Sequence, residues 1–275
     1  MRMTSSFTFP AILVGLSVLA PASTRGDEGV VRGSCPGLPS QPQLKAALDA
    51  AVQTETSGLN NHMWATVVNR DGLVCAVAFS GVDRSAQWPG SRVISAQKAN
   101  TANAFNLDNH SSSNGSGQPS GLALSTANLY SATQPGGSLY GLQHSNPVDT
   151  GAAYKGPSAS YGTPGDPLVG FKVGGVNVFG GGLALYDSSK QVVGGLGASG
   201  DTSCADHNIA WRVRHILALD YLAGVAGVSG DPTRPDNIVF DIAPNPSGGT
   251  GNSAGGFGHP ACLNTSGSDM LPPVR

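Results

Sequence analysis

Residues 194–211 read GGLGASGDTSCADHNIAW, a glycine-rich stretch that runs directly into a helical pattern. Gly195, Gly197 and Gly200 have the G-x-G-x-x-G spacing of dinucleotide-binding loops. The short remainder of the chain cannot complete a doubly wound sheet, and the preceding strand reads as half of an antiparallel hairpin. We therefore interpret the stretch as a strand that ends in a glycine turn and opens a helix. The N–H groups of such a helix terminus favour anionic ligand groups.

Helix and strand patterns extend outward from this turn. Apolar residues recur at helical spacing over Gln43–Ser57, Ser91–Phe105 and Ser203 to about Ala223, and a short helix is predicted at Leu122–Ala132. Strands are predicted at Met63–Asn69, Leu73–Phe79, Val176–Phe179, Leu183–Tyr186 and Gln191–Leu196. Turn signals join the first two strands and the last two into hairpins. The fold class is α/β (α+β), with a central antiparallel sheet of about five strands flanked by helices.

The N-terminus has the layout of a secretory signal peptide. Arg2 gives positive charge, Phe9–Leu19 is apolar, and Ala20-Pro-Ala22 is an A-x-A cleavage site. We expect residues 1–22 to be removed and the protein to be secreted or periplasmic. No second apolar span follows, so the mature chain is expected to lack a membrane span. A net charge of −2 without basic runs argues against a nucleic-acid partner.

All four cysteines follow the expected cleavage site. An even number in an oxidising compartment predicts two disulfide bonds, for which three pairings exist. We favour Cys35–Cys75 and Cys204–Cys262, because each bond would fasten a flexible end to the core. The spacings fit no zinc motif, since C-x-x-C is absent from the sequence.

Composition divides the mature chain into three parts: a polar leader at 23–42, a domain at 43–227 and a Gly/Pro-rich tail at 228–275. The domain contains a long Ser-, Gly-, Asn- and Pro-rich loop insertion at 106–172. A loop of that length inside a compact domain is usually functional or mobile. If it folds over a pocket, Tyr130, Tyr140 and His144 would supply aromatic walls; the alternative is a surface excursion.

Three blocks carry family motifs. Val67-Val-Asn-Arg-Asp-Gly72 matches VVD-x-x-G, Ile94–Ala102 matches A-x-x-KA-x-TA, and Gly175–Gly182 with Val193–Gly200 matches GG…G-x-x-GVSG. Over about 43–106 and 168–225 the chain thus resembles the GlcG/HbpS family of haem-binding proteins, which is related to the PduO C-terminal domain. Asn69 departs from the usual aspartate. The resemblance implies a profilin-like GlcG/HbpS architecture, a homo-oligomer, and haem as a cofactor.

The resemblance places a pocket where the glycine turn, Lys98 and Asp206 converge. The candidate ligand-binding residues are Lys98, Gly197, Ser199, Gly200, Asp206 and His207. Lys98 would offer a cation to a propionate or another carboxylate; its alternative is a surface lysine with a buried stem. Asp206 would face the ligand or a metal; its alternative is a structural carboxylate near a helix N-terminus.

Four histidines are candidates for an axial iron ligand: His207, His110, His144 and His259. His207 ranks first because it lies beside the glycine turn. A lone histidine is more often a solvated or hydrogen-bonded side chain, which stays open for each. No G-x-S-x-G elbow is present, so hydrolysis by a serine nucleophile is not supported.

The sequence predicts an extracytoplasmic small-molecule-binding protein whose ligand is haem or a related tetrapyrrole. An alternative is an enzyme that acts on a small organic substrate in the same pocket, with Lys98 and Asp206 as acid–base groups and the long loop as a lid. A further alternative is a structural or partner-binding module that uses the loop and the tail as interaction surfaces.

Overall fold

The structure, a computed structural model, describes residues 35–108, 121–249 and 251–275. These ranges all belong to one contact unit, residues 32–275. The predicted signal peptide and most of the predicted leader lie outside the described residues, as does His110. Within the described ranges, no helix has the length and apolar character needed to cross a membrane.

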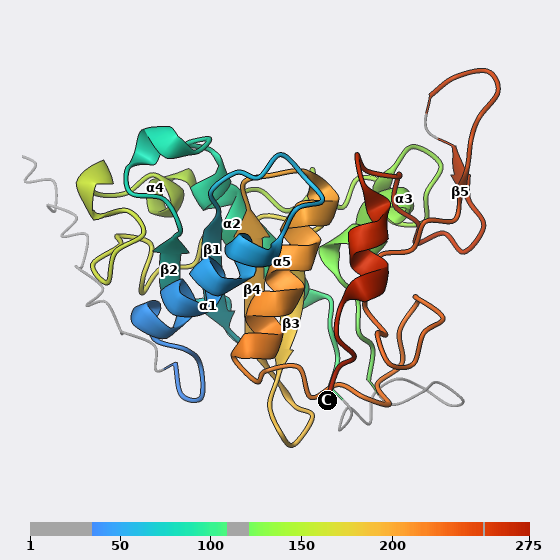
Figure 1. Ribbon diagram of the computed structural model, residues 1–275. Coiled ribbons are helices and arrows are strands. Elements are labelled where there is room, and N and C mark those ends of the chain that lie inside the picture. Colours follow the sequence, from blue (N-terminus) through green and yellow to red (C-terminus); the bar gives the residue numbers. More distant parts are fainter. Residues whose placement is uncertain (1–34, 109–120, 250) are drawn as a thin grey trace, which may run out of the picture. The chain divides into compact units, whose positions relative to one another are not determined.

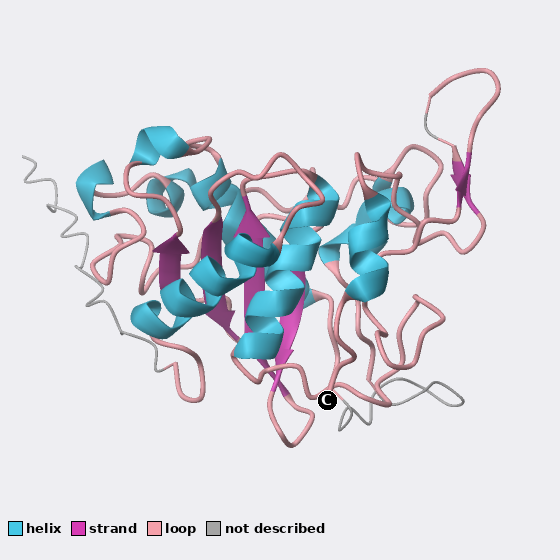
Figure 2. Ribbon diagram, viewed as in Figure 1, coloured by secondary structure: helices cyan, strands magenta, loops and turns pink. Residues whose placement is uncertain are grey.

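The centre of the fold is an antiparallel sheet (Figures 1 and 2). Its strands are β1 (Trp64–Asn69), β2 (Val74–Phe79), β3 (Gly182–Tyr186) and β4 (Val192–Ser199). They lie in the order β2-β1-β4-β3, and every neighbouring pair is antiparallel. The glycine-rich stretch is therefore the end of a central strand. No parallel crossover of the dinucleotide-binding kind follows it within the sheet.

The described residues form a sheet of four strands, fewer than the five expected. The predicted strand Val176–Phe179 is not one, because its backbone is bonded to side chains instead of a neighbouring strand. The Asn177 N–H donates to Thr101 Oγ1, and the Phe179 N–H donates to the side chain of Asn177. The apolar side chains of this segment are therefore buried by packing, although its backbone does not form the hydrogen bonds of a β-sheet.

Helices cover both faces of the sheet (Figure 1). The first face carries α1 (Gln41–Thr54) and α5 (Ser203–Ile216), and the other carries α2 (Ser91–Ala104). A capping box between Ser40 and Gln43 opens α1. Thr202 caps α5, which ends before the predicted Ala223. Ala218 turns into the left-handed region at φ 52°, and Leu219 O then accepts the Tyr186 N–H.

The glycines of β4 are needed for the close approach of α2. A Cβ at Gly197 would overlap the Ser95 carbonyl oxygen, and one at Gly195 would overlap that of Ala99. The A-x-x-KA-x-TA helix and the glycine strand are therefore two halves of one packing unit. Any side chain larger than hydrogen at either position would push α2 off the sheet.

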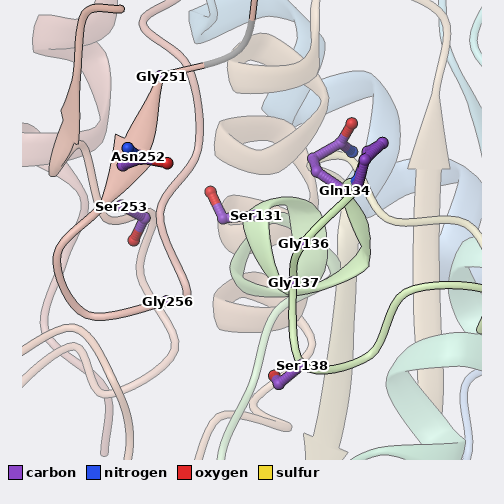
Figure 3. A pocket seen from close by; sticks show the side chains of 10 residues that line it. Ser131, Gln134, Gly136, Gly137, Ser138, Gly251, Asn252, Ser253 and Gly256 are labelled. Atoms are coloured by element: carbon purple, nitrogen blue, oxygen red, sulfur yellow. The ribbon is translucent and has the colours of Figure 1, made fainter.

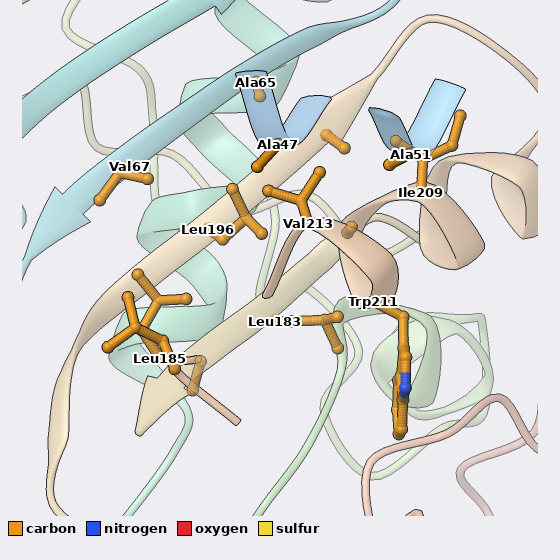
Figure 4. Packing of buried hydrophobic residues seen from close by; sticks show 14 of the residues in the cluster. Ala47, Ala51, Ala65, Val67, Leu183, Leu185, Leu196, Ile209, Trp211 and Val213 are labelled. Carbon is orange, nitrogen blue, oxygen red and sulfur yellow. The ribbon is translucent and has the colours of Figure 1, made fainter. Parts of the chain in front are cut away.

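The main hydrophobic core lies between the sheet and the α1–α5 layer. Figure 4 shows Leu183, Leu185 and Leu196 of the sheet facing Ile209 and Val213 of α5. The opposite face of the sheet packs on α2 through a smaller cluster that includes Val68, Val77 and Ala96. Burial on both faces explains why β1 has apolar residues on both of its faces, with only Thr66 and Asn69 polar.

The insertion and the tail add short elements at the margins of the sheet. In chain order these are η2 (Thr126–Leu129), α3 (Tyr130–Thr133), α4 (Thr150–Ala153), η3 (Ser158–Ser160), β5 (Ile242–Ala243), β6 (Asn252–Ser253) and η4 (Thr265–Met270), and a further short helix, η1 (Arg84–Ala86), lies between β2 and α2. The tail is packed on the domain: Leu271 and Val274 join the main core, and Trp211 Nε1 donates to Pro272 O at 2.9 Å.

Two disulfide bonds join Cys35 to Cys75 and Cys204 to Cys262. This is the pairing that the sequence analysis favoured. The first bond ties the segment before α1 to β2, and the second ties the tail to the first turn of α5. Each bond therefore attaches one end of the chain to the central fold.

Candidate functional site

Lys98 and Asp206 meet beside the end of β4, as the motif positions predict. Lys98 Nζ lies 2.6 Å from Asp206 Oδ2 and donates to Ala198 O at 3.0 Å. The other carboxylate oxygen, Asp206 Oδ1, accepts the N–H groups of Gly200 and Asp201 at 3.1 and 2.8 Å. The glycine turn therefore presents its backbone N–H groups to a carboxylate of the chain itself.

The Lys98–Asp206 pair is fully enclosed, with exposed fractions of 0 % and 1 %. Burial lowers the pKa of Lys98, and the carboxylate of Asp206 opposes that shift. Burial also raises the pKa of Asp206 to about 6, while Lys98 acts to lower it. Both shifts come from loss of water, and each partner's charge is the principal compensation for the other.

The segment between α2 and β3 closes over this pair. Phe179 places its ring 4.4 Å from Lys98 Nζ. A Cβ at Gly181 would lie 3.1 Å from Lys98 Nζ and 3.0 Å from Asp206 Cβ. Gly197, Ser199 and Gly200 are buried next to the pair. None of the predicted ligand-binding residues lines either of the two cavities described below.

His207 follows Asp206 but is directed into the packing beneath the tail. Its Nε2 lies 3.2 Å from Asn237 Oδ1, and its ring centroid is 5.7 Å from that of Trp211. Its Nδ1 has no hydrogen-bond partner among the described residues. Burial lowers the pKa of His207 to about 4, so the imidazole is neutral at ordinary pH.

His259 occupies a position that sequence reasoning did not anticipate. Its Nδ1 lies 2.7 Å from Pro260 O, which can only accept, so Nε2 accepts from Ser203 Oγ at 2.7 Å in the neutral ring. Ser203 Oγ also accepts the Gly180 N–H. Burial lowers the pKa of His259 and favours this neutral form. The Ser203–His259 bond lies beside the second disulfide and helps to attach the tail to α5.

Two cysteine sulfurs lie near His259, within the spacing of a metal site. The ligand atoms of Cys204, His259 and Cys262 are all within 4.8 Å of one another. Both sulfurs are joined in the disulfide, and only thiolates bind metals strongly. His144, the remaining described candidate, is exposed in the insertion.

A small polar cavity lies between the insertion and the tail (Figure 3). Its volume is about 460 Å³, and it is lined by Ser131, Gln134 and the following glycines on one side and by Asn252 and Ser253 on the other. No charged side chain lines it. Such a surface lacks the apolar walls and convergent polar groups that usually hold an organic ligand.

A larger cleft, about 850 Å³, opens beside the first hairpin. It is bordered by residues 41–49 of α1, by Trp64 and Phe79, by residues 81–84 and by residues 158–164. We call it the aromatic cleft. No family motif includes these residues, and the sequence analysis missed them. The only sequence signal is a pair of aromatic residues at the two ends of the predicted hairpin.

The four-stranded sheet with helices on both faces is the GlcG/HbpS type of α/β fold that the motifs predict. Residues 41–214 match the family model described as haem degrading protein HbpS-like. The chain belongs to this HbpS-like family.

The solved structures that resemble the chain include the following two. The Klebsiella pneumoniae protein ORFY, assigned to DUF336, is 23 % identical, covers 67 % of this chain and 90 % of its own, and has a TM-score of 0.41. A structure described as a PduOC:heme complex is 22 % identical, covers 64 % and 89 %, and also has a TM-score of 0.41. No curated protein sequence matches the chain.

Proposed function

We propose that the protein is an extracytoplasmic small-molecule-binding protein and that its ligand is haem or a related tetrapyrrole. The observation that carries this proposal is the match of residues 41–214 to a family described as haem degrading. The three motif blocks that form the α2–β4 packing unit and the hairpin all fall within those residues.

The two disulfide bonds support the extracytoplasmic part of the proposal. Every cysteine of the chain is in one of them, and such bonds persist in oxidising compartments. The predicted signal peptide at residues 1–22 agrees with this location. From the family resemblance we also expect a homo-oligomer, which light scattering on the purified protein will test.

The residues around Lys98 do not fit a porphyrin in this conformation. Lys98 is 0 % exposed, and its charge is already compensated by Asp206, so a propionate cannot reach it unless the segment that covers the pair moves away. His207 is 0 % exposed, and its Nε2 is engaged by Asn237. The prediction that these residues bind the ligand therefore requires an opened form. Their enclosure also gives no support to the alternative enzymatic role of Lys98 and Asp206.

The aromatic cleft provides the room that the Lys98 region lacks. Its volume of about 850 Å³ lies within the range of cavities that hold organic ligands, roughly 300–1,000 Å³. The walls of the cleft also contain aromatic side chains, which suit an apolar ring system, and its charged residues are Lys45, Arg84, Asp49 and Asp83.

A titration of the purified, disulfide-intact protein with hemin tests the proposed function. We expect a shifted Soret band that saturates at a fixed stoichiometry per subunit. Metal-free protoporphyrin IX, followed by its fluorescence, separates binding of the ring from ligation of the iron. A folded protein that changes neither spectrum would refute tetrapyrrole binding.

A pair of variants then tests the predicted axial ligand. If His207 ligates iron, His207→Gln will alter the Soret position and leave protoporphyrin binding intact. His215→Gln, at a histidine of the same helix that is not a candidate ligand, is the control and should leave both spectra unchanged. Identical hemin spectra for the wild type and His207→Gln would remove His207 from the ligand set.

A further inference from the structure

The aromatic cleft is built around a stacked pair from the first hairpin. Trp64 and Phe79 are direct cross-strand partners, and their rings stack at 4.3 Å with an interplanar angle of 16°. The pair is largely covered, with exposed fractions of 2 % and 7 %, and both residues line the cleft. Aromatic side chains favour offset-stacked or edge-to-face contacts with another ring.

The wall formed by the insertion is held in place before any ligand arrives. Gln41 Nε2 donates to Gly162 O at 2.7 Å, and the Gly162 N–H donates to Asp166 Oδ2 at 2.7 Å. Asp166 in turn forms a buried ion pair with Arg92, whose guanidinium lies 3.5 Å over the ring of Tyr161. A wall fixed by such contacts loses little conformational entropy on binding.

The rim of the cleft is unusually apolar for a solvated surface. Val82 is 95 % exposed, and Pro42, Ala46, Ala159 and Pro164 are exposed around the same opening. Their side chains come from three separate segments, so the fold gathers them at one place. An apolar ligand seated in the cleft would cover this surface and remove it from water.

The charges at the rim leave one cation available. Lys45 Nζ is bonded to both carboxylate oxygens of Asp49 at 2.7 Å. Asp83 accepts from the backbone N–H of Ser85 and caps η1. Arg84 is exposed and forms no ion pair with any described residue. An anionic group at the edge of the ligand would therefore meet Arg84 without displacing an existing partner.

We propose that the aromatic cleft is a binding site for an apolar aromatic molecule that carries an anionic group. The aromatic ring system would lie against the Trp64–Phe79 pair, and the anionic group would pair with Arg84. The site is separate from the buried Lys98–Asp206 pair. The proposal rests on the proposed function only in the choice of a tetrapyrrole as one probe.

Filling the cleft tests the proposal directly. Ala46→Trp places an indole in the opening from an exposed position of α1. Ala50→Trp puts the same indole one helical turn further along, at an exposed position that does not line the cleft. Hemin, protoporphyrin IX and anilinonaphthalene sulfonate serve as probes. We expect Ala46→Trp to weaken binding about 10- to 100-fold and Ala50→Trp to leave it unchanged.

Removing the cation tests the anionic group. Arg84→Gln should weaken binding of the same probes by about two- to fivefold, and the loss should shrink as salt is added. Lys172→Gln removes an exposed lysine outside the cleft and is the matched control. Equal loss in both variants would show that Arg84 has no specific part.

The outcomes separate the cleft from the proposed function. Hemin bound with equal affinity by Ala46→Trp and the wild type would leave tetrapyrrole binding intact and overturn the cleft as its site. Binding of anilinonaphthalene sulfonate that Ala46→Trp abolishes, without binding of either tetrapyrrole, would support the cleft and refute the proposed function. Failure of all three probes to bind the folded wild type would overturn the cleft proposal.

Discussion

Two regions of the molecule pair a lysine with an aspartate at nearly the same distance. Lys98 and Asp206 are 2.6 Å apart and are 0 % and 1 % exposed, whereas Lys45 and Asp49 are 2.7 Å apart and are 36 % and 37 % exposed. The first pair belongs to a family motif and is sealed inside the fold. The second stands at the rim of the aromatic cleft, which no motif marks. The family motif therefore marks a pair that is buried inside the fold, and the lysine–aspartate pair that solvent reaches lies at the aromatic cleft.

The largest expected effect comes from breaking the buried pair. Asp206→Asn leaves Lys98 buried without its counter-charge, so we expect a loss of about 3–5 kcal/mol in the free energy of unfolding. Asp49→Asn, the matched change in the exposed pair, should cost less than about 1 kcal/mol. Urea denaturation measures both, and equal losses would contradict the contrast drawn between the two pairs.

A second variant keeps this test from depending on one substitution. Lys98→Met combined with Asp206→Asn removes both charges. The amide oxygen of the new asparagine can still accept the Gly200 and Asp201 N–H groups. We expect the double variant to be more stable than Asp206→Asn alone, because no unpaired ammonium remains inside. A double variant as unstable as Asp206→Asn would show that geometry, and not charge, is what the pair supplies.

A smaller effect on the free energy of unfolding is expected from His207, and this effect depends on pH. Its pKa is about 4 in the folded state, against an ordinary value of 6.5, so between these values the unfolded chain binds more protons. Stability from the neutral ring is therefore present above pH 6.5 and is lost as pH falls toward 4, by about 3 kcal/mol in all. The difference in unfolding free energy between the wild type and His207→Gln should therefore fall as pH is lowered from 6.5 toward 4.

Asp206 titrates in the opposite sense within nearly the same range. Its raised pKa, about 6 against 3.8, makes stability fall as pH rises between these values. Both proteins in the His207 comparison contain Asp206, so their difference isolates the histidine. A difference that stays flat from pH 4 to 6.5 would contradict the burial of a neutral His207.

The smallest expected loss of stability concerns Gly162, in the wall of the aromatic cleft. Gly162 has φ 76°, and a Cβ there would lie 2.8 Å from Phe79 Cβ and 3.1 Å from Trp64 Cζ3. Gly136 has φ 86° with nothing within 4 Å, so Gly136→Ala measures the cost of the left-handed backbone alone. We expect Gly162→Ala to lose about 1–3 kcal/mol more than this control. Thermal unfolding compares them, and equal losses would show that the wall yields easily.

Sequence reasoning was accurate where local pattern and packing agree. The hairpin at β1–β2 was predicted from its turn signal, the helix α2 from helical spacing, and the favoured disulfide pairing from the position of Cys35 and Cys262 toward the chain ends. The strand expected at Val176–Phe179 was wrong, because side chains of α2 and of the segment itself took its hydrogen bonds. The early end of α5 at Ile216 was not predicted. It depends on Leu219, whose carbonyl oxygen accepts the N–H of Tyr186 in the edge strand β3.

The candidate site divides in the same way. The family resemblance placed Lys98 and Asp206 beside the glycine turn, and they are in contact. Spacing could not reveal that Phe179 and Gly181 close the turn, because that depends on how a non-repeating segment crosses the pair. It also could not reveal the Ser203–His259 bond, whose partners are 56 residues apart.

By itself, the sequence determined the family, the order of the principal helices and strands, and the glycines on which α2 rests, because these depend on short-range periodicity and on residues that tolerate no side chain. Only the tertiary structure decided which charged groups are enclosed and where a cavity opens. Burial and empty space are made by segments distant in the chain, such as α1, the β1–β2 hairpin and residues 158–164 around the aromatic cleft. No local sequence pattern shows which distant segments come together.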